Sequence, residues 1–414
     1  MRILFVLHQF YPEFSAGTEQ VTLNLARSAQ RAGHHAHVLA CVTDARNSPA
    51  TPDPGFPELL QTVHQGVPIT LISQERLSPF SHIGFDSNPK LIERLSAWMT
   101  RERLDACHVL HAMRMSDALV ALQRCKIPYL MTLTDFFTPC FRINLVNGQG
   151  ALCDGPEEGE RCVRDCLVAP WTPESLRARY RHAQDLLAGA LRRVCPSEYV
   201  AERFRGAFPE LEFLVIPHGI DLLALTAGES KPQKEDDALV FGFVGSIVPQ
   251  KGLDMLLRAF ARVPDPHVRL RLCGGFFGDP VHAQEVRQLM EKDPRVEWLG
   301  QVPHAAVFEM LRALDVLCLP SRVPESFSLV LHEACAAGVP ALVSALGAPG
   351  ALVSRQGFGR ALPVDDEAAW AEAIGSIAAD CRRLAEWRAR VPLPMRVEEE
   401  GFFYDSLYRE LRQR

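Results

Sequence analysis

The sequence predicts an α/β protein made of two Rossmann-like domains that face a central cleft. Short apolar runs alternate with segments of helical spacing along most of the chain. In both halves, loops rich in glycine and polar residues follow apolar runs, which is where open α/β sheets bind their ligands. A polar, charged stretch at 226–237, TAGESKPQKEDD, is the best linker near the middle. We therefore expect one domain over residues 1–222 and a second over 223–397.

The composition is that of an ordinary globular protein. Hydrophobic residues make up 47% of the 414 residues and charged residues 23%. The formal net charge of −6 argues against nonspecific nucleic-acid binding as the main activity. No apolar run approaches the roughly 20 residues of a membrane span, and ILFVL near the N-terminus is too short for a signal peptide. We expect a cytoplasmic protein whose twelve cysteines form no disulfide framework.

The first half reads as alternating strands and helices. An apolar run at 2–7 is typical of a strand buried on both faces of a parallel sheet. The loop after it ends in AGT, and a glycine loop between a first strand and a first helix is the ordinary phosphate-approach turn of this fold class. The remaining expected elements are helices at 19–32, 89–99 and 173–191, strands at 37–41, 68–72, 106–112 and 129–134, and a proline-rich loop at 47–57.

The segment 78–86, SPFSHIGFD, is apolar and aromatic for a loop. It either contacts an acceptor or a membrane surface, or it packs in the interior.

The second half contains the most informative stretch, PSRVPESFSLVLHEACAAGVPALVS at 320–344. An apolar run ends at its first proline, and a polar loop carrying Glu325 follows. A helix is expected from Phe327 to Ala337, where glycine and proline stop it, and ALVS forms the next strand. Strand, loop, helix and strand make one right-handed β-α-β unit.

Two glutamates, Glu325 and Glu333, lie before and inside this helix. If the loop ends near Ser328, the helix N-terminus directs its free N–H groups at the ligand crevice. Glu333 lies one turn beyond Leu329, on the same helix face. This arrangement suits a nucleotide sugar, with amides for the diphosphate and carboxylates for ribose and sugar hydroxyls. Taken alone, two glutamates near a helix are more often solvated surface charges.

Four cysteines, Cys140, Cys153, Cys162 and Cys166, fall in a polar segment with few large apolar side chains. The pattern C-x12-C-x8-C-x3-C is compatible with a structural zinc ion held by four thiolates, which would leave no open catalytic position. The alternative is unligated thiols or two adventitious disulfides.

The sequence around the two glutamates resembles that of a known family. PESFSLVLHEACAAGVPALVS is similar to the donor-binding signature of family 4 retaining glycosyltransferases, E-G-F-G-L-x-x-x-E-A-x-A-x-G-x-P-V. The likeness continues in YPEFSAGTE (Y-P-P-x-x-G-G-x-E), VIPHGID (V-I-P-N-G-I-D) and GSIVPQKG (G-R-L-x-x-x-K-G). It implies the GT-B architecture, with a C-terminal helix, here 398–414, that crosses back onto the first domain.

The resemblance also implies an activity: transfer of a sugar, with retention, from a nucleotide-diphosphate sugar to an acceptor hydroxyl. The acceptor would be a glycan, a lipid-linked molecule or a small molecule, with peripheral contact at the inner membrane face in the lipid-linked case. In such enzymes the leaving phosphate takes the acceptor proton, so neither a separate base nor a catalytic metal is expected. Two alternatives stay open: a non-catalytic nucleotide-sugar-binding or scaffold protein, and an epimerase or phosphorylase on the same fold.

Roles carry over residue by residue. Lys251 fits the lysine that neutralises the donor diphosphate, Glu333 would hold the ribose, and Glu325 and His111 would contact the sugar ring. His108 is the second candidate histidine, because the family motif H-x-H is imperfect here. Gly17 and Thr18 lie where substrates approach the backbone. The expected substrate contacts are Gly17, Thr18, Ser246, Lys251, Arg322, Ser326, Phe327, Ser328, Leu329 and Glu333.

The chain departs from the family pattern at several positions. Ala16 replaces a glycine, Thr134 replaces a histidine, and Ser246 replaces an arginine that usually assists the lysine. Arg322, in the loop before Glu325, is the arginine available as a substitute for the one missing at position 246.

Overall fold

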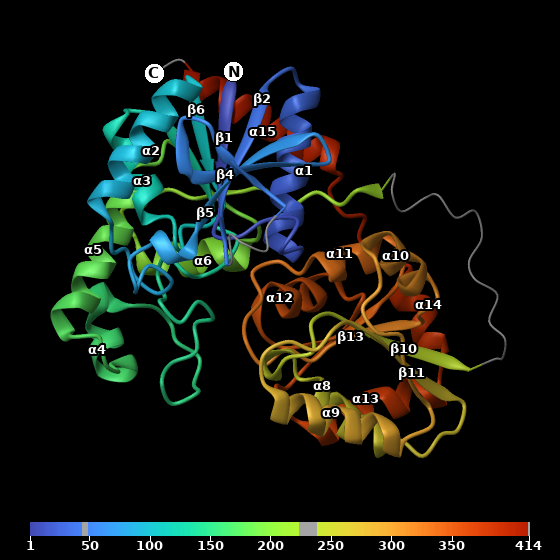
Figure 1. Ribbon diagram of the computed structural model, residues 1–414. Helices are drawn as coiled ribbons and strands as arrows, with labels where there is room; N and C mark the ends of the chain where they lie inside the picture. The colour runs from blue at the N-terminus through green and yellow to red at the C-terminus, as the bar shows by residue number, and fades with distance from the viewer. Residues whose placement is uncertain (44–48, 223–237, 413–414) are drawn as a thin grey trace. The chain divides into compact units, whose positions relative to one another are not determined.

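The computed structural model describes residues 1–43, 49–222 and 238–412, apart from the side chains of residues 304 and 305 (Figure 1). The expected linker at 226–237 lies outside the described residues. The contacts divide the chain into two compact units: unit 1 holds Met1–Gly219 and Val397–Arg414, and unit 2 holds Ile220–Arg396. Within the described ranges, no helix is long and apolar enough to cross a membrane.

Unit 1 is built on a nine-stranded sheet in the order β3-β4-β5-β2-β1-β6-β7-β8-β9. The strands from β5 to β9 pair in parallel, and β4 and β3 extend the sheet antiparallel at one edge. The strands are β1 (Arg2–Val6), β2 (His35–Val42), β3 (Thr51–Asp53), β4 (Phe56–His64), β5 (Val67–Ser73), β6 (Ala106–Val109), β7 (Tyr129–Thr132), β8 (Arg193–Cys195) and β9 (Leu214–Val215).

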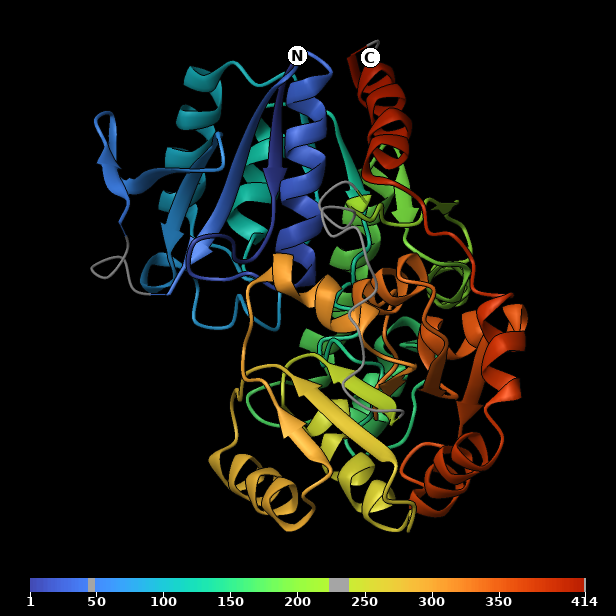
Figure 2. The same cartoon turned by 90° about the vertical axis from the view of Figure 1, so that its right-hand side faces the viewer.

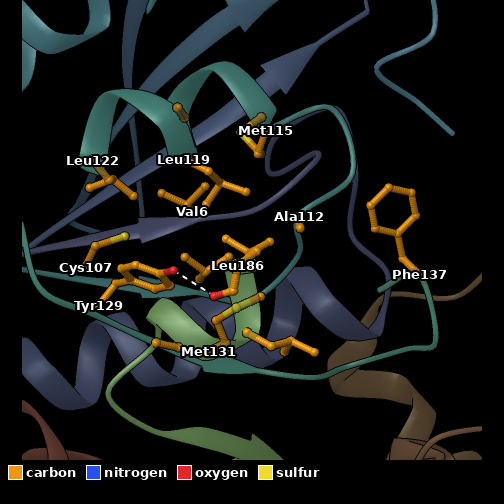
Figure 3. Packing of buried hydrophobic residues seen from close by; sticks show 14 of the residues in the cluster. Val6, Cys107, Ala112, Met115, Leu119, Leu122, Tyr129, Met131, Phe137 and Leu186 are labelled. Carbon is orange, nitrogen blue, oxygen red and sulfur yellow. Dashed lines mark hydrogen bonds between the residues drawn. The ribbon is translucent and has the colours of Figure 1, made fainter. Parts of the chain in front are cut away.

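Helices cover both faces of this sheet. Helices α1 and α15 contact each other on one side, whereas α2, α3, α5 and α6 share a core on the other (Figures 1 and 2). In that core the buried Tyr129 hydroxyl donates a hydrogen bond of 2.7 Å to the Leu186 carbonyl, which ties β7 to α5 (Figure 3). The helices are α1 (Gly17–Arg31), α2 (Pro89–Glu102), α3 (Ser116–Arg124), α4 (Glu160–Cys166), α5 (Pro173–Gly189), α6 (Glu198–Ala207) and α15 (Val397–Arg412).

Unit 2 has a six-stranded, fully parallel sheet in the order β12-β11-β10-β13-β14-β15, which is the 3-2-1-4-5-6 order of the Rossmann fold. Figure 1 shows α10, α11 and α12 on one face and α8, α9 and α13 on the other. The elements are β10 (Leu239–Val244), α8 (Leu253–Ala261), β11 (Val268–Cys273), α9 (Pro280–Lys292), β12 (Val296–Trp298), α10 (His304–Arg312), β13 (Val316–Leu319), α11 (Leu329–Ala336), β14 (Ala341–Ser344), α12 (Gly347–Gln356), β15 (Gly359–Leu362), α13 (Glu367–Ala379) and α14 (Arg382–Arg388).

The strand order reverses beside the first strand of each sheet. In unit 1 the reversal lies between β1 and β6, and in unit 2 it lies between β10 and β13. Loops that leave the carboxyl ends of two such strands turn to opposite faces, so they leave room for a ligand between them. A ligand-binding site is therefore expected among the side chains that follow β1, β6, β10 and β13.

The proline-rich segment expected as a loop at 47–57 is partly strand, so that prediction is wrong. Its proline at position 52 sits in β3, which is an edge strand and tolerates a missing ladder donor. Asp53 is 1% exposed and accepts hydrogen bonds from the Arg101 guanidinium, which lowers the pKa of that carboxyl. Phe56 is buried beneath the guanidinium groups of Arg94 and Arg101.

His108, the second candidate histidine, is a structural residue. It is fully buried in β6, with Nδ1 2.9 Å from the Tyr408 hydroxyl and Nε2 2.7 Å from Thr132 Oγ1. Thr132 Oγ1 lies 2.6 Å from the Tyr404 hydroxyl as well. Burial lowers the pKa of His108 well below its ordinary value, so the ring is neutral. Nδ1 thus joins the sheet to α15 and Nε2 bonds within the sheet, so neither ring nitrogen is left for a substrate.

A second buried contact fixes α15 to the segment that ends unit 1. Glu400 is 1% exposed, and its Oε2 accepts the Gly219 N–H at 3.0 Å. Its Oε1 lies 3.1 Å from Nδ1 of His218, which is 4% exposed. The same carboxylate therefore satisfies two polar groups that have no access to water.

Glu400→Ala is expected to lower the free energy of unfolding by about 2–4 kcal/mol, because it leaves the Gly219 N–H and the His218 ring without their acceptor. The measurement is the urea midpoint. The matched control is Glu398→Ala, since Glu398 lies in the same helix turn with a 45% exposed side chain and one distant ion pair to Arg31; a change below about 0.5 kcal/mol is expected there. Equal effects of the two variants would contradict the assignment.

Candidate active site

The switch point of unit 2 brings together the loop after β10 and the loop after β13. The first contains Lys251 and ends at Gly252, which has a φ of +67°. A Cβ at Gly252 would lie 2.1 Å from the Pro320 carbonyl oxygen at the end of β13. Only glycine permits this approach, and it places Lys251 beside the residues that follow β13.

Lys251 and Glu325 form an ion pair at this place. Lys251 Nζ donates to Glu325 Oε1 at 2.8 Å, and the Ser321 hydroxyl donates to the same oxygen. Burial alone would raise the pKa of the Glu325 carboxyl, but the Lys251 charge and hydrogen bonds more than offset it, and the pKa lies below its usual range. At neutral pH Glu325 is therefore a carboxylate that accepts a hydrogen bond from Lys251.

The start of α12, which follows β14, packs against the backbone of Glu325. Gly347 has a φ of +68°, and a Cβ there would lie 2.5 Å from the Glu325 nitrogen. The Ala348 N–H donates to the Glu325 carbonyl at 2.9 Å. The backbone of Glu325 is thus held between the ends of β13 and β14.

Helix α11 begins next to this pair with an uncapped N-terminus. Its N-cap residue, Ser328, makes no side-chain capping bond and has a φ of +72°. Phe327 and His332 stack at 3.8 Å between ring centroids and 5° between planes, in the N′ and N4 positions of a hydrophobic staple. Sequence reasoning missed His332, although an aromatic residue five positions before a histidine at a helix start is the signal that would have found it.

Glu333 is 8% exposed on α11, and Ser326 and Leu329 are half-buried beside the helix start. Because Glu333 is buried, it is not one of the solvated surface charges that two glutamates near a helix usually are. Ser246 is exposed just after β10. Lys251 and Glu325 therefore lie beside the segment 326–329 that leads into α11, and Glu333 lies one turn further on that helix.

Arg322 does not substitute for the arginine missing at position 246. Its guanidinium donates to Asp254 at 2.7 and 2.8 Å, to Asp365 at 2.6 Å and to the Pro249 carbonyl at 2.8 Å. The hydrogen bonds that Arg322 donates to Asp254 raise the pKa of the guanidinium further. These bonds use four of the five N–H donors of the side chain, which serves to hold the β10 and β13 loops together.

The switch point of unit 1 carries two histidines. His8 follows β1 and His111 follows β6, and their ring centroids are 4.0 Å apart. The Met113 N–H donates to His111 Nδ1 at 3.1 Å, so the ring proton is on Nε2, which donates to Asp135. His111 is thereby fixed in one tautomer at the carboxyl end of the sheet. Thr134 stands at the position where the family pattern has a histidine. Its hydroxyl donates a hydrogen bond to the Leu110 carbonyl at 2.9 Å, so it does not act in the way that a histidine ring would.

Gly17 and Thr18 form the first turn of α1, after an N-cap residue, Ala16, that makes no side-chain cap.

The apolar segment 78–86 is packed in the interior at one residue and exposed at another. Its Phe85 lies 5.5 Å from the Phe137 ring and 4.6 Å from the His182 ring, whereas Phe80 is 41% exposed.

The four cysteines line one small cavity of about 10 Å³. Even so, no group of three or more His, Cys, Asp or Glu side chains within 1–43, 49–222 and 238–412 is placed to hold a metal ion. Burial raises the pKa of Cys140 and Cys166, and it raises that of Cys162 to about 12, so these groups are neutral thiols. Cys153 donates to the Gly155 carbonyl at 3.4 Å. The expected four-thiolate zinc site is not supported.

The reasoning behind the zinc prediction failed because other contacts order this segment. Arg179 is 6% exposed and donates to the carbonyls of Ile83, Phe137 and Thr138. Phe141 is buried against Trp171, and Glu160 pairs with Arg177 at 2.5 Å. Contacts of the segment with Trp171 and α5 therefore supply order that the zinc prediction assigned to a metal.

Family models match both halves of the chain. The model described as Glycosyltransferase Family 4 matches residues 15–222, and the one described as Glycosyl transferases group 1 matches residues 227–391. The chain belongs to the family 4 glycosyltransferases. It is therefore an enzyme of sugar transfer, and the resemblance seen in its motifs is confirmed.

Relatives named as glycosyltransferases match the chain as well. A phosphatidyl-myo-inositol mannosyltransferase of Mycolicibacterium smegmatis is 26% identical over 386 residues, which is 90% of this glycosyltransferase and 84% of the relative. A D-inositol 3-phosphate glycosyltransferase of Kribbella flavida is 34% identical over 194 residues, 42% of this chain and 44% of the relative.

Solved structures share the fold and confirm the GT-B architecture. HepE of Anabaena, solved in complex with UDP and glucose, aligns with a TM-score of 0.71 and 18% identity over 99% of this chain and 100% of its own. Sucrose-phosphate synthase of Thermosynechococcus elongatus aligns with a TM-score of 0.71 and 21% identity over 99% and 98%.

Ser328→Gly is expected to raise the free energy of unfolding by about 0.5–1 kcal/mol, because it removes the strain of a positive φ that exceeds the entropy cost of glycine. Ser326→Gly, two residues earlier and without a positive φ, is the control and should lower it by a similar amount. Urea midpoints measured on both variants give the comparison. A loss of stability in both would show that Ser328 carries no strain.

Proposed function

We propose that this glycosyltransferase transfers a hexosyl group from a nucleoside diphosphate sugar to an acceptor hydroxyl, with retention of the anomeric configuration. Unit 2 binds the donor and unit 1 binds the acceptor. The observation that carries the proposal is the Lys251–Glu325 pair beside the uncapped start of α11. It combines a cation and free helix N–H groups for a diphosphate with a carboxylate for sugar hydroxyls.

The donor class is supported by the neighbours. HepE was solved with UDP and glucose and with UDP-glucose, and its fold matches this chain over nearly its whole length. On this proposal Lys251 and the first amides of α11 stabilise charge on the departing diphosphate. Glu333, one turn further on α11, accepts hydrogen bonds from ribose hydroxyls, and Glu325 contacts the hexosyl ring. These groups are charged and fixed before the substrate binds, which is what lowers the barrier for a charge-separating step.

The chemistry on the acceptor side needs little from the protein. His111 is fixed by Asp135 and the Met113 amide, so its ring is a rigid surface for the hexosyl group. The acceptor oxygen attacks the anomeric carbon on the face that the diphosphate leaves, and the departing phosphate oxygen takes the acceptor proton. Lipid-linked acceptors such as those named for the mannosyltransferase relative would bring the enzyme to a membrane surface.

The proposal predicts turnover with retention. The enzyme would be incubated with a panel of nucleoside diphosphate hexoses and polyol or glycan acceptors, and nucleotide release and the anomeric proton coupling of the product would be followed by NMR. We expect a product with the configuration of the donor. An inverted product would refute retention, and nucleotide-sugar binding without turnover would favour the scaffold alternative. Donor isomerised without acceptor would favour an epimerase.

Lys251→Ala is expected to lower kcat at least about tenfold, because the charge on the leaving group is no longer neutralised. Lys292→Ala, an exposed lysine at the end of α9, is the matched control and should act like the parent enzyme. Full activity of Lys251→Ala would place the diphosphate elsewhere.

The same variant should change the pH dependence of stability. In the parent enzyme the lowered pKa of Glu325 adds stability that is complete above its usual value of 4.5 and is lost as the pH falls through the lowered value. Without Lys251, burial raises the pKa instead, so the ionised carboxylate destabilises the fold at pH 7.5. The difference in urea midpoint between the parent and Lys251→Ala should therefore shrink between pH 7.5 and pH 5.

A further inference from the structure

Three polar groups at the switch point of unit 1 have no role in the chemistry described above. Glu19 lies in the first turn of α1 and is 1% exposed, and His8 is 9% exposed. Within the described residues, neither carboxylate oxygen of Glu19 and not the Nδ1 of His8 has a hydrogen-bond partner. A buried polar group without a partner costs about 1–3 kcal/mol, and native proteins leave few of them.

Arg114 is the third group. It has a φ of +63°, and its N–H donates to the Ser81 carbonyl at 2.8 Å. A non-glycine residue stays in this region only where its surroundings impose it, and such positions gather at functional sites. In the part of the chain that the structure describes, the Arg114 guanidinium forms no ion pair or hydrogen bond. The side chain is half-buried, so water screens its charge only in part, and the exposed part can contact a ligand.

These groups lie close to one another and to His111. The His8 and His111 rings are in contact, and burial, with His111 and Arg114 nearby, lowers the pKa of His8. Burial raises the pKa of Glu19, and the nearby His111 offsets only a small part of this. His8 is therefore a neutral ring with one free nitrogen, and Glu19 is a buried acceptor. The other acids nearby are already engaged, since Asp135 accepts from His111 and Glu13 accepts the Thr43 N–H at 3.0 Å.

We infer that unit 1 binds a polyol that carries a phosphate, with Arg114 on the phosphate and Glu19 and His8 on neighbouring hydroxyl groups. A guanidinium matches phosphate geometry with parallel N–H donors. A buried carboxylate and a neutral imidazole nitrogen match hydroxyl protons, which satisfies the groups that the protein leaves unpaired. This rests on the proposed function, because it names the acceptor class of the same enzyme. The phosphate belongs either to a free polyol phosphate or to a phospholipid headgroup.

The test is acceptor binding by calorimetry, with UDP present at saturation. The probes are matched pairs: myo-inositol 1-phosphate and myo-inositol, glucose 6-phosphate and glucose, and glycerol 3-phosphate and glycerol. Vesicles of phosphatidylinositol in phosphatidylcholine form a separate arm. At least one phosphorylated probe, or the phosphatidylinositol vesicle, should bind at least about tenfold more tightly than its partner without the phosphate group or headgroup.

Arg114→Ala should remove that difference and leave the affinity for the unphosphorylated partner within about twofold. Arg114→Lys should keep part of it, and Arg124→Ala, an exposed arginine at the end of α3, should change nothing. Glu19→Gln should weaken both members of a pair equally. Tight binding to vesicles alone would assign the phosphate to a lipid headgroup.

The inference is overturned if no phosphorylated probe or vesicle exceeds its partner, or if Arg114→Ala weakens both members of a pair alike. UDP binding measured separately on the parent enzyme distinguishes this failure from failure of the proposed function. If UDP binds and the phosphate makes no difference, the acceptor class is wrong and the donor site stands. If UDP does not bind, the donor assignment is wrong as well.

Discussion

Parallel strand pairing with a reversal beside the first strand is the constraint on which both sites depend. A parallel sheet sends every connection through a helix, so the carboxyl ends of all its strands meet at one edge. At the reversal, the two loops diverge and leave a place that no helix fills. In unit 2 this is where Lys251 meets Glu325 across 74 positions of sequence, and in unit 1 it is where the rings of His8 and His111 meet.

Close backbone packing turns that place into a defined geometry. Gly252 fits against the Pro320 carbonyl, and Gly347 fits against the Glu325 nitrogen, at distances that no side chain would allow. Arg322 then ties the two loops to Asp254 and Asp365. The charged pair is therefore built on rigid backbone, and its position does not depend on the donor being present. Fixed charges of this kind stabilise a transition state without reorganising.

The sequence predicted the fold and the loop-and-helix segment on which the unit 2 candidate site is built, because that information is local. Residues 320–344 encode strand, loop, helix and glycine stop within one segment, and Glu325 and Glu333 fall at fixed offsets in it. The errors arose where a residue's partner is distant or unusual. His108 bonds to Tyr408, 300 positions away, and Arg179 donates to the Thr138 carbonyl just before the cysteine segment. The segment around the proline in β3 is expected to be a loop, because proline rarely occurs inside a sheet. That β3 is an edge strand, which tolerates proline, depends on the order of strands in the whole sheet and not on the segment itself.

The contacts of α15 have a consequence for the order of folding during synthesis. Polar side chains within the first sheet, such as His108 and Thr132, are satisfied by Tyr404 and Tyr408, near the end of the chain. The ribosome therefore makes all of unit 2 before unit 1 receives its last helix. Until then the part of the unit 1 sheet that α15 covers is exposed to water, and such surfaces are where aggregation begins. Unit 2 is continuous in sequence and has no such delay, so it is the part that can mature first.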